Sequence, residues 1–133
     1  MSEVKTNKLT GTSPAGSIVV TGEGNSTSTN LQQGLGKVWC NQSNGTTIND
    51  SFNTSSVDDN GTGAYETNLT NSMSSNDYAR NALGGQSGYR ATIDTVSHAS
   101  NTASSIYTYC ARADNGAAID VDDVSSLGHG ALA

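Results

Sequence analysis

The sequence has few apolar residues, few charged residues and little proline. Apolar side chains account for 33% of the 133 residues and charged side chains for 14%, with a single proline, whereas charged residues make up about 25% of a typical soluble domain. One copy of the chain can therefore build only a thin core. Either the chain is disordered, or it folds by sharing apolar surface with other copies. The aromatic residues stand at strand-like positions between turn signals, which favours the oligomer.

The scarcity of basic residues and of apolar runs argues against two kinds of partner. Six Lys and Arg against twelve Asp and Glu give a net charge of −6, and nucleic-acid binding requires clustered basic residues. No segment approaches the roughly 20 apolar residues of a membrane span. The best apolar run near the N-terminus is Ile18–Val20, so no secretion signal is recognised. We expect neither a nucleic-acid partner nor membrane insertion.

Only two cysteines, Cys40 and Cys110, are present. Each lies in a predicted strand beside an aromatic residue, so we expect two small, buried core side chains. A disulfide between them is the alternative, and it would require an oxidising setting. No Cys-x-x-Cys pair occurs, and His98 and His129 are isolated and remote in sequence from the cysteines. We therefore expect no metal site and no cofactor.

Ser, Thr, Asn and Gly make up 64 of the 133 residues, and they separate short, half-apolar runs. Three such runs are Lys37–Cys40, Ile48–Val57 and Ala64–Thr70. Asn44-Gly45, between the first two, is a strong signal for a two-residue hairpin. Alternation with period two between turn signals predicts an antiparallel β-meander over residues 34–83.

Strand signals are weaker in the second half of the chain. Residues 89–93 alternate and predict one moderate strand. Ile106–Ala113 has bulky side chains on both faces, which predicts a central position in a sheet or at a subunit contact. A last strand is expected over Ala117–Val124, followed by a tail of small residues, Ser125–Ala133.

Residues 1–33 differ from the rest of the chain. They contain two short β-like runs, Val4–Leu9 and Ser17–Thr21, with Pro14 in a turn-like setting between them. We therefore expect an all-β protein with an extended N-terminal arm or stalk over residues 1–33. A small antiparallel β-sandwich head of seven or eight strands, jelly-roll-like, is expected over residues 34–133.

The stretch from Gly34 to Tyr78 resembles a domain of fibre and virion-surface proteins of tailed phages, especially marine phages and cyanophages. The motifs that match, in the family's order, are Gly34-Leu35-Gly36-Lys37-Val38-Trp39, Ser51-Phe52-Asn53-Thr54-Ser55-Ser56, Asp59-Asn60-Gly61-Thr62-Gly63-Ala64-Tyr65, and Met73 to Tyr78. The resemblance implies a non-enzymatic virion structural protein, either a short fibre or a capsid decoration protein. It would be a homotrimer at the virion surface, made in the host cytoplasm, released by lysis and bound to capsid or tail proteins.

The N-terminal residues Ser2-Glu3-Val4-Lys5 resemble the start of many phage fibre proteins, which implies that this end anchors the protein to the particle. The residues expected to anchor it are Val4, Lys5, Lys8 and Leu9. The strand aromatics expected in the core or at a subunit interface are Trp39, Phe52, Tyr65 and Tyr109. The alternative function is a tail-fibre adhesin that binds a host surface glycan, since Tyr rings beside amides suit adhesive surfaces. The tyrosines that could then contact sugar are Tyr78, Tyr89 and Tyr107.

Two acidic clusters, Asp58–Gly61 and Asp120–Asp123, could in principle supply calcium ligands. A calcium site needs about six to eight converging oxygens, and the spacing matches no calcium motif. We therefore interpret the first cluster as a turn and the second as a solvated strand edge. The sequence also shows no pair of carboxylates suited to glycoside hydrolysis, no nucleophile elbow and no phosphate loop. We therefore expect no enzymatic activity.

Overall fold

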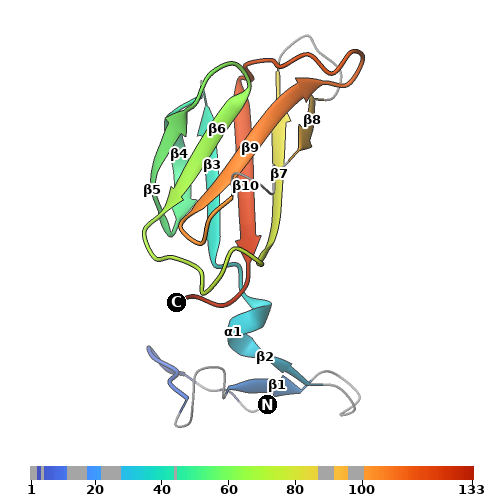
Figure 1. Ribbon diagram of the computed structural model, residues 1–133. Helices are drawn as coiled ribbons and strands as arrows, with labels where there is room; N and C mark the ends of the chain where they lie inside the picture. Colours follow the sequence, from blue (N-terminus) through green and yellow to red (C-terminus); the bar gives the residue numbers. More distant parts are fainter. Residues whose placement is uncertain are drawn as a thin grey trace. The chain divides into compact units, whose positions relative to one another are not determined.

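The computed structural model describes Glu3 and residues 5–11, 18–21, 28–43, 45–86, 92–95 and 101–133. Contacts divide the chain into two compact units, Met1–Leu35 and Gly36–Ala133 (Figure 1). The boundary that the sequence suggests, after residue 33, lies two residues before this division. Within the described residues the fold is all-β except for one short helix, α1 (Leu31–Gly34).

The N-terminal unit has little regular structure among its described residues. Strands β1 (Val19–Thr21) and β2 (Ser28–Asn30) form an antiparallel pair, and α1 follows directly, with the Leu31 amide donating to the Ile18 carbonyl at 2.8 Å. Strand β1 falls within the predicted run Ser17–Thr21. The predicted strand Val4–Leu9 is wrong for residues 5–9, which form no strand, while Val4 lies outside the described residues.

The unit Gly36–Ala133 contains two four-stranded antiparallel sheets that lie face to face as a small β-sandwich (Figure 1). The first sheet has the order β4-β3-β10-β7 and the second the order β5-β6-β9-β8. The strands are β3 (Val38–Ser43), β4 (Thr47–Phe52), β5 (Thr54–Asp59), β6 (Ala64–Leu69), β7 (Ala79–Gly85), β8 (Thr92–Thr95), β9 (Ser105–Arg112) and β10 (Asp123–His129). The last strand thus returns to pair with the first strand of the unit.

The predicted hairpin between β3 and β4 is confirmed, but its loop has three residues, 44–46, and not the two that were predicted. Ser43 pairs with Thr47 across the turn, and Gly45 has a φ of 80°, a left-handed conformation that glycine adopts without steric cost. The single strand predicted over Ile48–Val57 is wrong, because the chain turns a corner at Asn53 and passes from the first sheet to the second. Asn53 has a φ of 58°, which Asn tolerates better than most residues.

The Asn53 side chain fixes this corner. Its amide nitrogen donates to the carbonyls of Lys37 and Asn71, both at 3.0 Å, and its amide oxygen accepts from the Asn71 backbone N–H at 2.7 Å. One side chain therefore satisfies three backbone groups where the chain leaves a sheet, and such groups would otherwise lack partners.

The core between the sheets forms two clusters of buried side chains. The first consists of Val38, Leu69, Met73, Tyr78 and Ile106. The second consists of Tyr65, Cys110, Ile119, Val121 and Val124. A polar contact also crosses the interior, since the hydroxyls of Thr67 and Ser126 lie 3.3 Å apart. The core is small and partly polar, as the composition predicts.

The prediction for the C-terminal strand is wrong. The strand expected over Ala117–Val124 begins only at Asp123, and β10 runs through the supposed tail as a central strand between β3 and β7. Its inward residues include Ser126 and Gly128, because there is little space between this strand and the core side chains. A Cβ on Gly128 would lie 2.7 Å from Cγ1 of Val38. Strand β7 was not predicted either.

Strand β9 confirms the prediction for Ile106–Ala113, displaced by one residue. It lies centrally between β6 and β8, and its alternation is as expected: Ile106, Thr108 and Cys110 are buried, whereas Tyr107 and Tyr109 lie on the outward face and are half-buried. Strand β8 overlaps the strand predicted over residues 89–93, of which residues 89–91 lie outside the described part.

Candidate functional site

The aromatic residues expected in the core or at an interface fall into two groups. Tyr65 is a core residue and Tyr109 is half-buried on an outward face. Trp39 and Phe52 are not in the core, because 37% and 52% of their surfaces are exposed. Their pairing explains this, since residues directly opposite in a sheet share a face and Trp39 pairs with Phe52 on the side away from buried Val38 and Cys40. An interface role for both stays a prediction.

Tyr78 is not available for sugar contact. Only 7% of it is exposed, and its hydroxyl lies 2.9 Å from the Ser105 carbonyl, to which it donates. Burial raises the pKa of Tyr78, although Arg80, 5.5 Å from its ring centre, lowers it in part. The assignment of Tyr78 to glycan binding is therefore wrong. Tyr89 lies outside the described residues, and Tyr107 faces outward from β9.

The other predicted positions are placed as follows. Lys5 forms an exposed ion pair with Glu3 at 3.4 Å, and Lys8 and Leu9 are exposed. Cys40 and Cys110 are both buried and form no disulfide, so the disulfide alternative is wrong. Burial raises the pKa of the Cys40 thiol. His98 lies outside the described residues.

The outward face of the first sheet presents an apolar row across three neighbouring strands. Its members are Phe52, Trp39 and Leu127, because Trp39 pairs with both Phe52 on β4 and Leu127 on β10. Leu127 is 39% exposed. Towards the Ser43 end of β3 the row is followed on the same face by polar contacts, such as that of Asn41 with Ser125 at 3.0 Å. Exposed large side chains that adjoin one another in this way typically mark a contact surface.

Beside this row the same face is hollowed between β10 and β7. We call this hollow the leucine groove; its volume is about 220 Å³ and it is lined by Asn81, Ala82, Leu83, Ser125, Ser126 and Leu127. Leu83 is 67% exposed, and it stands diagonally opposite Leu127 because Leu83 pairs with Ser125 and Leu127 pairs with Asn81. The small Ser125 leaves the space between the two leucines open.

The outward face of the second sheet is polar by contrast. The Asn68 amide donates to the Asp58 carboxylate at 2.8 Å and to the Ser56 hydroxyl at 3.1 Å. The Asn60 amide donates to the Glu66 carboxylate at 3.2 Å. Tyr107 lies next to Glu66 on the neighbouring strand. Over β5 and β6 this face is covered by hydrogen-bonded polar groups, and β9 adds the half-buried rings of Tyr107 and Tyr109.

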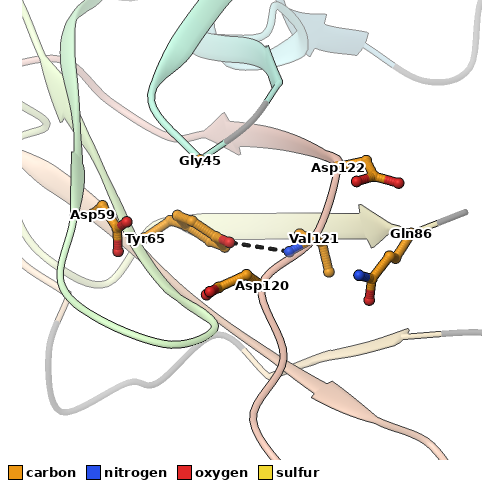
Figure 2. Close-up of a pocket in the computed structure, with 7 residues that line it drawn as sticks. All are labelled: Gly45, Asp59, Tyr65, Gln86, Asp120, Val121 and Asp122. Carbon is orange, nitrogen blue, oxygen red and sulfur yellow. Dashed lines mark hydrogen bonds between the residues drawn. The ribbon is translucent and has the colours of Figure 1, made fainter.

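A second hollow, which we call the aspartate pocket, lies at one end of the sandwich. Its volume is about 280 Å³ and its lining is Gly45, Asp59, Tyr65, Gln86, Asp120, Val121 and Asp122. Figure 2 shows Tyr65 at its centre with the hydroxyl directed at the backbone of Val121, Asp59 and Asp120 to one side, and Asp122 and Gln86 to the other. The pocket brings the two acidic clusters together. Both clusters are evident in the sequence but their proximity is not, because they are far apart along the chain.

Local hydrogen bonds fix the walls of this pocket. The Val121 backbone N–H donates to the Tyr65 hydroxyl at 3.1 Å, and the Gly63 N–H donates to the Asp120 carboxylate at 2.7 Å. Burial raises the pKa of Tyr65, and the negative charge of Asp120 raises it further, against the lowering effect of the Val121 N–H. The side-chain oxygen of Gln86 is buried without a hydrogen-bond partner.

The two acidic clusters differ from each other. Asp59 accepts from the Gly61 N–H at 2.9 Å, which confirms the predicted turn. The second cluster is not a strand edge, because Asp123 begins central strand β10 while Asp120 and Asp122 line the pocket. Among the described residues, no three His, Cys, Asp or Glu side chains are grouped so that they could hold a metal ion.

Comparisons with models of protein families, with curated proteins and with solved structures find no match to this chain. In the part of the chain that the structure describes, no helix is both long and apolar enough to cross a membrane.

Proposed function

We propose that this protein is a non-enzymatic structural protein of a tailed-phage particle, a short fibre or capsid decoration protein that assembles as a homotrimer. The observation that supports assembly most strongly is the apolar row on the outward face of the first sheet. Large apolar side chains that adjoin on an exposed sheet are better covered by a partner than left in water. The resemblance of Gly34–Tyr78 to virion-surface domains supports the particle as the setting.

The division into two units supports separate roles for them, anchoring and head. Residues 1–35 form a small unit with few strands, and residues 36–133 hold both core clusters. In our proposal the first unit anchors the protein through Lys5, Lys8, Leu9 and neighbouring Val4, and the second is the jelly-roll-like head. Capsid or tail proteins are the partners of the first unit, and the protein is placed at the virion surface.

Localisation on purified particles tests this proposal. Gold-labelled antibody against the full chain is expected to bind particles, and peptides of the chain are expected among the particle proteins. A chain that lacks residues 1–33 is expected to be missing from particles. Label on no particle, or normal incorporation of the truncated chain, would contradict the proposal or its anchoring part respectively.

A second candidate function, a tail-fibre adhesin for a host surface glycan, is favoured by the aspartate pocket. The pocket lies at the Gly45 end of the sandwich, whereas the chain enters that unit at Gly36, before the other end of β3. Carboxylates and an amide around a tyrosine can accept and donate hydrogen bonds to sugar hydroxyls.

Glycan-array binding distinguishes this candidate from a purely structural role. An adhesin is expected to retain specific glycans, and Asp122→Asn, which changes a pocket residue, is expected to weaken that binding. Asp77→Asn, an exposed aspartate away from the pocket, is the matched control. Binding no higher than background on every glycan would contradict the adhesin function and leave the structural one in place.

A further inference from the structure

We propose that copies of this chain meet through the outward face of the first sheet, with Phe52 and Trp39 of one copy packed against the leucine groove of the next around a three-fold axis. This inference rests on the trimeric part of the proposed function and identifies the contact that makes the trimer. It does not depend on where on a particle the protein is found.

The face contains both halves of such a contact. Its β4–β3 half bears two aromatic side chains that stand out from the sheet, Phe52 and Trp39, and its β10–β7 half bears an apolar hollow. A three-fold axis parallel to the strands, in front of this face, brings the β4–β3 half of each copy against the β10–β7 half of the next. A ring of three closes when each copy offers two different patches in this way.

The strand pairings also show which residues of neighbouring copies would lie at the same height along the proposed axis. Phe52, Trp39, Leu127 and Asn81 form one row across the sheet. A rotation about an axis parallel to the strands keeps every residue at its own level. Phe52 of one copy therefore arrives at the level of Asn81 of the next, which lines the groove. Leu83 lies two residues further along β7, about 7 Å away, at the level that Asp50 of the neighbouring copy reaches.

Charges on the face permit this contact and disfavour other occupants. The outward side chains of β7 are Ala79, Asn81, Leu83 and Gly85, so an approaching Asp50 of β4 meets no like charge there. The strands of this face carry two outward acidic residues, Asp50 and Asp123, against one outward histidine, His129, which disfavours an anionic lipid surface or a nucleic acid. A second copy, which supplies aromatic side chains for the groove, fits better.

The size of the face sets the expected strength of the contact. Four strands about 4.8 Å apart and six residues rising about 3.4 Å each give a geometric area of about 400 Å² for the whole face, and each contact of the ring uses half of it, about 200 Å² per partner. Stable interfaces bury about 800 Å² per partner. The head contact alone is therefore expected to be weak, with assembly that depends on concentration in the micromolar range.

A charge-pair experiment on the full chain tests the contact. The native mass is measured from low to high micromolar concentration for the natural chain, for Phe52→Lys, for Leu83→Glu and for the double variant. Phe52 and Leu83 lie on the opposite edge strands of the sheet, about 16 Å apart when the offset along the strands is included, so they meet only between copies. Leu132→Lys, at an exposed leucine outside the strands, is the matched control.

We expect a trimer for the natural chain and for Leu132→Lys, at least a tenfold loss of assembly in each single face variant, and recovery in the double variant. Unchanged melting temperatures of the single variants in dilute solution show that these variants fold. A chain that stays monomeric or forms only dimers at every concentration would overturn the proposal. So would a trimer that both single variants leave intact. Neither result would affect particle localisation, which tests the proposed function separately.

Discussion

The two sheets of the head share a core but differ on their outward faces. On the first sheet, Trp39, Phe52 and Leu127 form an exposed apolar row. On the second, carboxylates and amides, such as those of Asp58 and Asn68, bond to one another. Covering the first face removes apolar surface from water at about 25 cal/mol per Å². Covering the second would desolvate charged groups that are already satisfied, which costs free energy.

This difference shows where a chain of such low apolar content uses its large side chains. The inward positions hold two tyrosines, Tyr65 and Tyr78, beside smaller residues such as Val38 and Ser126, while the single Trp and the single Phe face outward. A chain that leaves its Trp and its Phe outside so thin a core is better explained as one part of an assembly than as a monomer.

The largest expected effect lies between the sheets. Ile106 is fully buried in the first core cluster, so Ile106→Ala should lower the free energy of unfolding by about 2–5 kcal/mol. Denaturant unfolding followed by circular dichroism measures this change. A loss below about 1 kcal/mol would mean that the inside of the sandwich is not the stabilising region, and the comparison of its outward faces would lose its basis.

A smaller loss of stability is expected for a larger residue on the inward side of β10, where the core leaves little space. In Gly128→Ala the new Cβ would lie 2.7 Å from Val38 Cγ1 and 3.3 Å from Met73 Cε, and overpacking of this kind costs about 1–3 kcal/mol. Gly85→Ala is the matched control, because its Cβ would meet nothing within 4 Å. Equal melting temperatures for the two variants would contradict the packing described for β10.

Substitution of Trp39 tests whether this residue acts on the outward face or in the core. If Trp39 were buried, Trp39→Ala would cost about 3–5 kcal/mol. Because it is 37% exposed, we expect a loss of about 1 kcal/mol in dilute chain, close to the range of surface substitutions. Assembly should weaken much more. Tyr107→Ala, on the outward face of the second sheet, should leave assembly unchanged; weakened assembly in that variant alone would reverse the roles of the two faces.

A still smaller effect concerns pH. Burial raises the pKa of both Tyr65 and Tyr78 above the ordinary value of about 10, so the folded state holds the phenolic proton more tightly than the unfolded state. This contribution to stability is fully present below about pH 10 and is lost as the pH rises through the higher folded pKa. Denaturation at increasing pH should show this decline, and Tyr78→Phe should make it shallower. An identical slope in that variant would contradict the burial of Tyr78.

Much of the fold could be predicted from the sequence, because short alternating runs and turn signals act locally. The hairpin at Asn44-Gly45 and the alternation within β9 are examples. The corner at Asn53 could not be predicted, since its conformation depends on hydrogen bonds to Lys37 and Asn71. Strand β10 was not predicted because its small residues resemble a tail. They are small because the side chains opposite them, such as Val38, leave no room for larger ones, and only the folded structure shows these neighbours.

The site could be predicted less well than the fold. Large aromatic residues in strands suggest a core, but the face on which each lies depends on the register, and the register places Trp39 and Phe52 outside. The aspartate pocket brings together Asp59 and Asp120, which are far apart in sequence. Neither the groove nor the pocket has a local motif, so sequence patterns alone do not reveal them.

Trp39 is the single tryptophan of the chain, so its fluorescence reports directly on the apolar face. The most direct measurement is acrylamide quenching of Trp39 from low to high micromolar concentration, with the native mass recorded on the same samples. If Trp39 lies in the contact between copies, we predict that quenching falls and the emission moves to shorter wavelength as trimers form. Trimers in which Trp39 stays as accessible as in the monomer would contradict it.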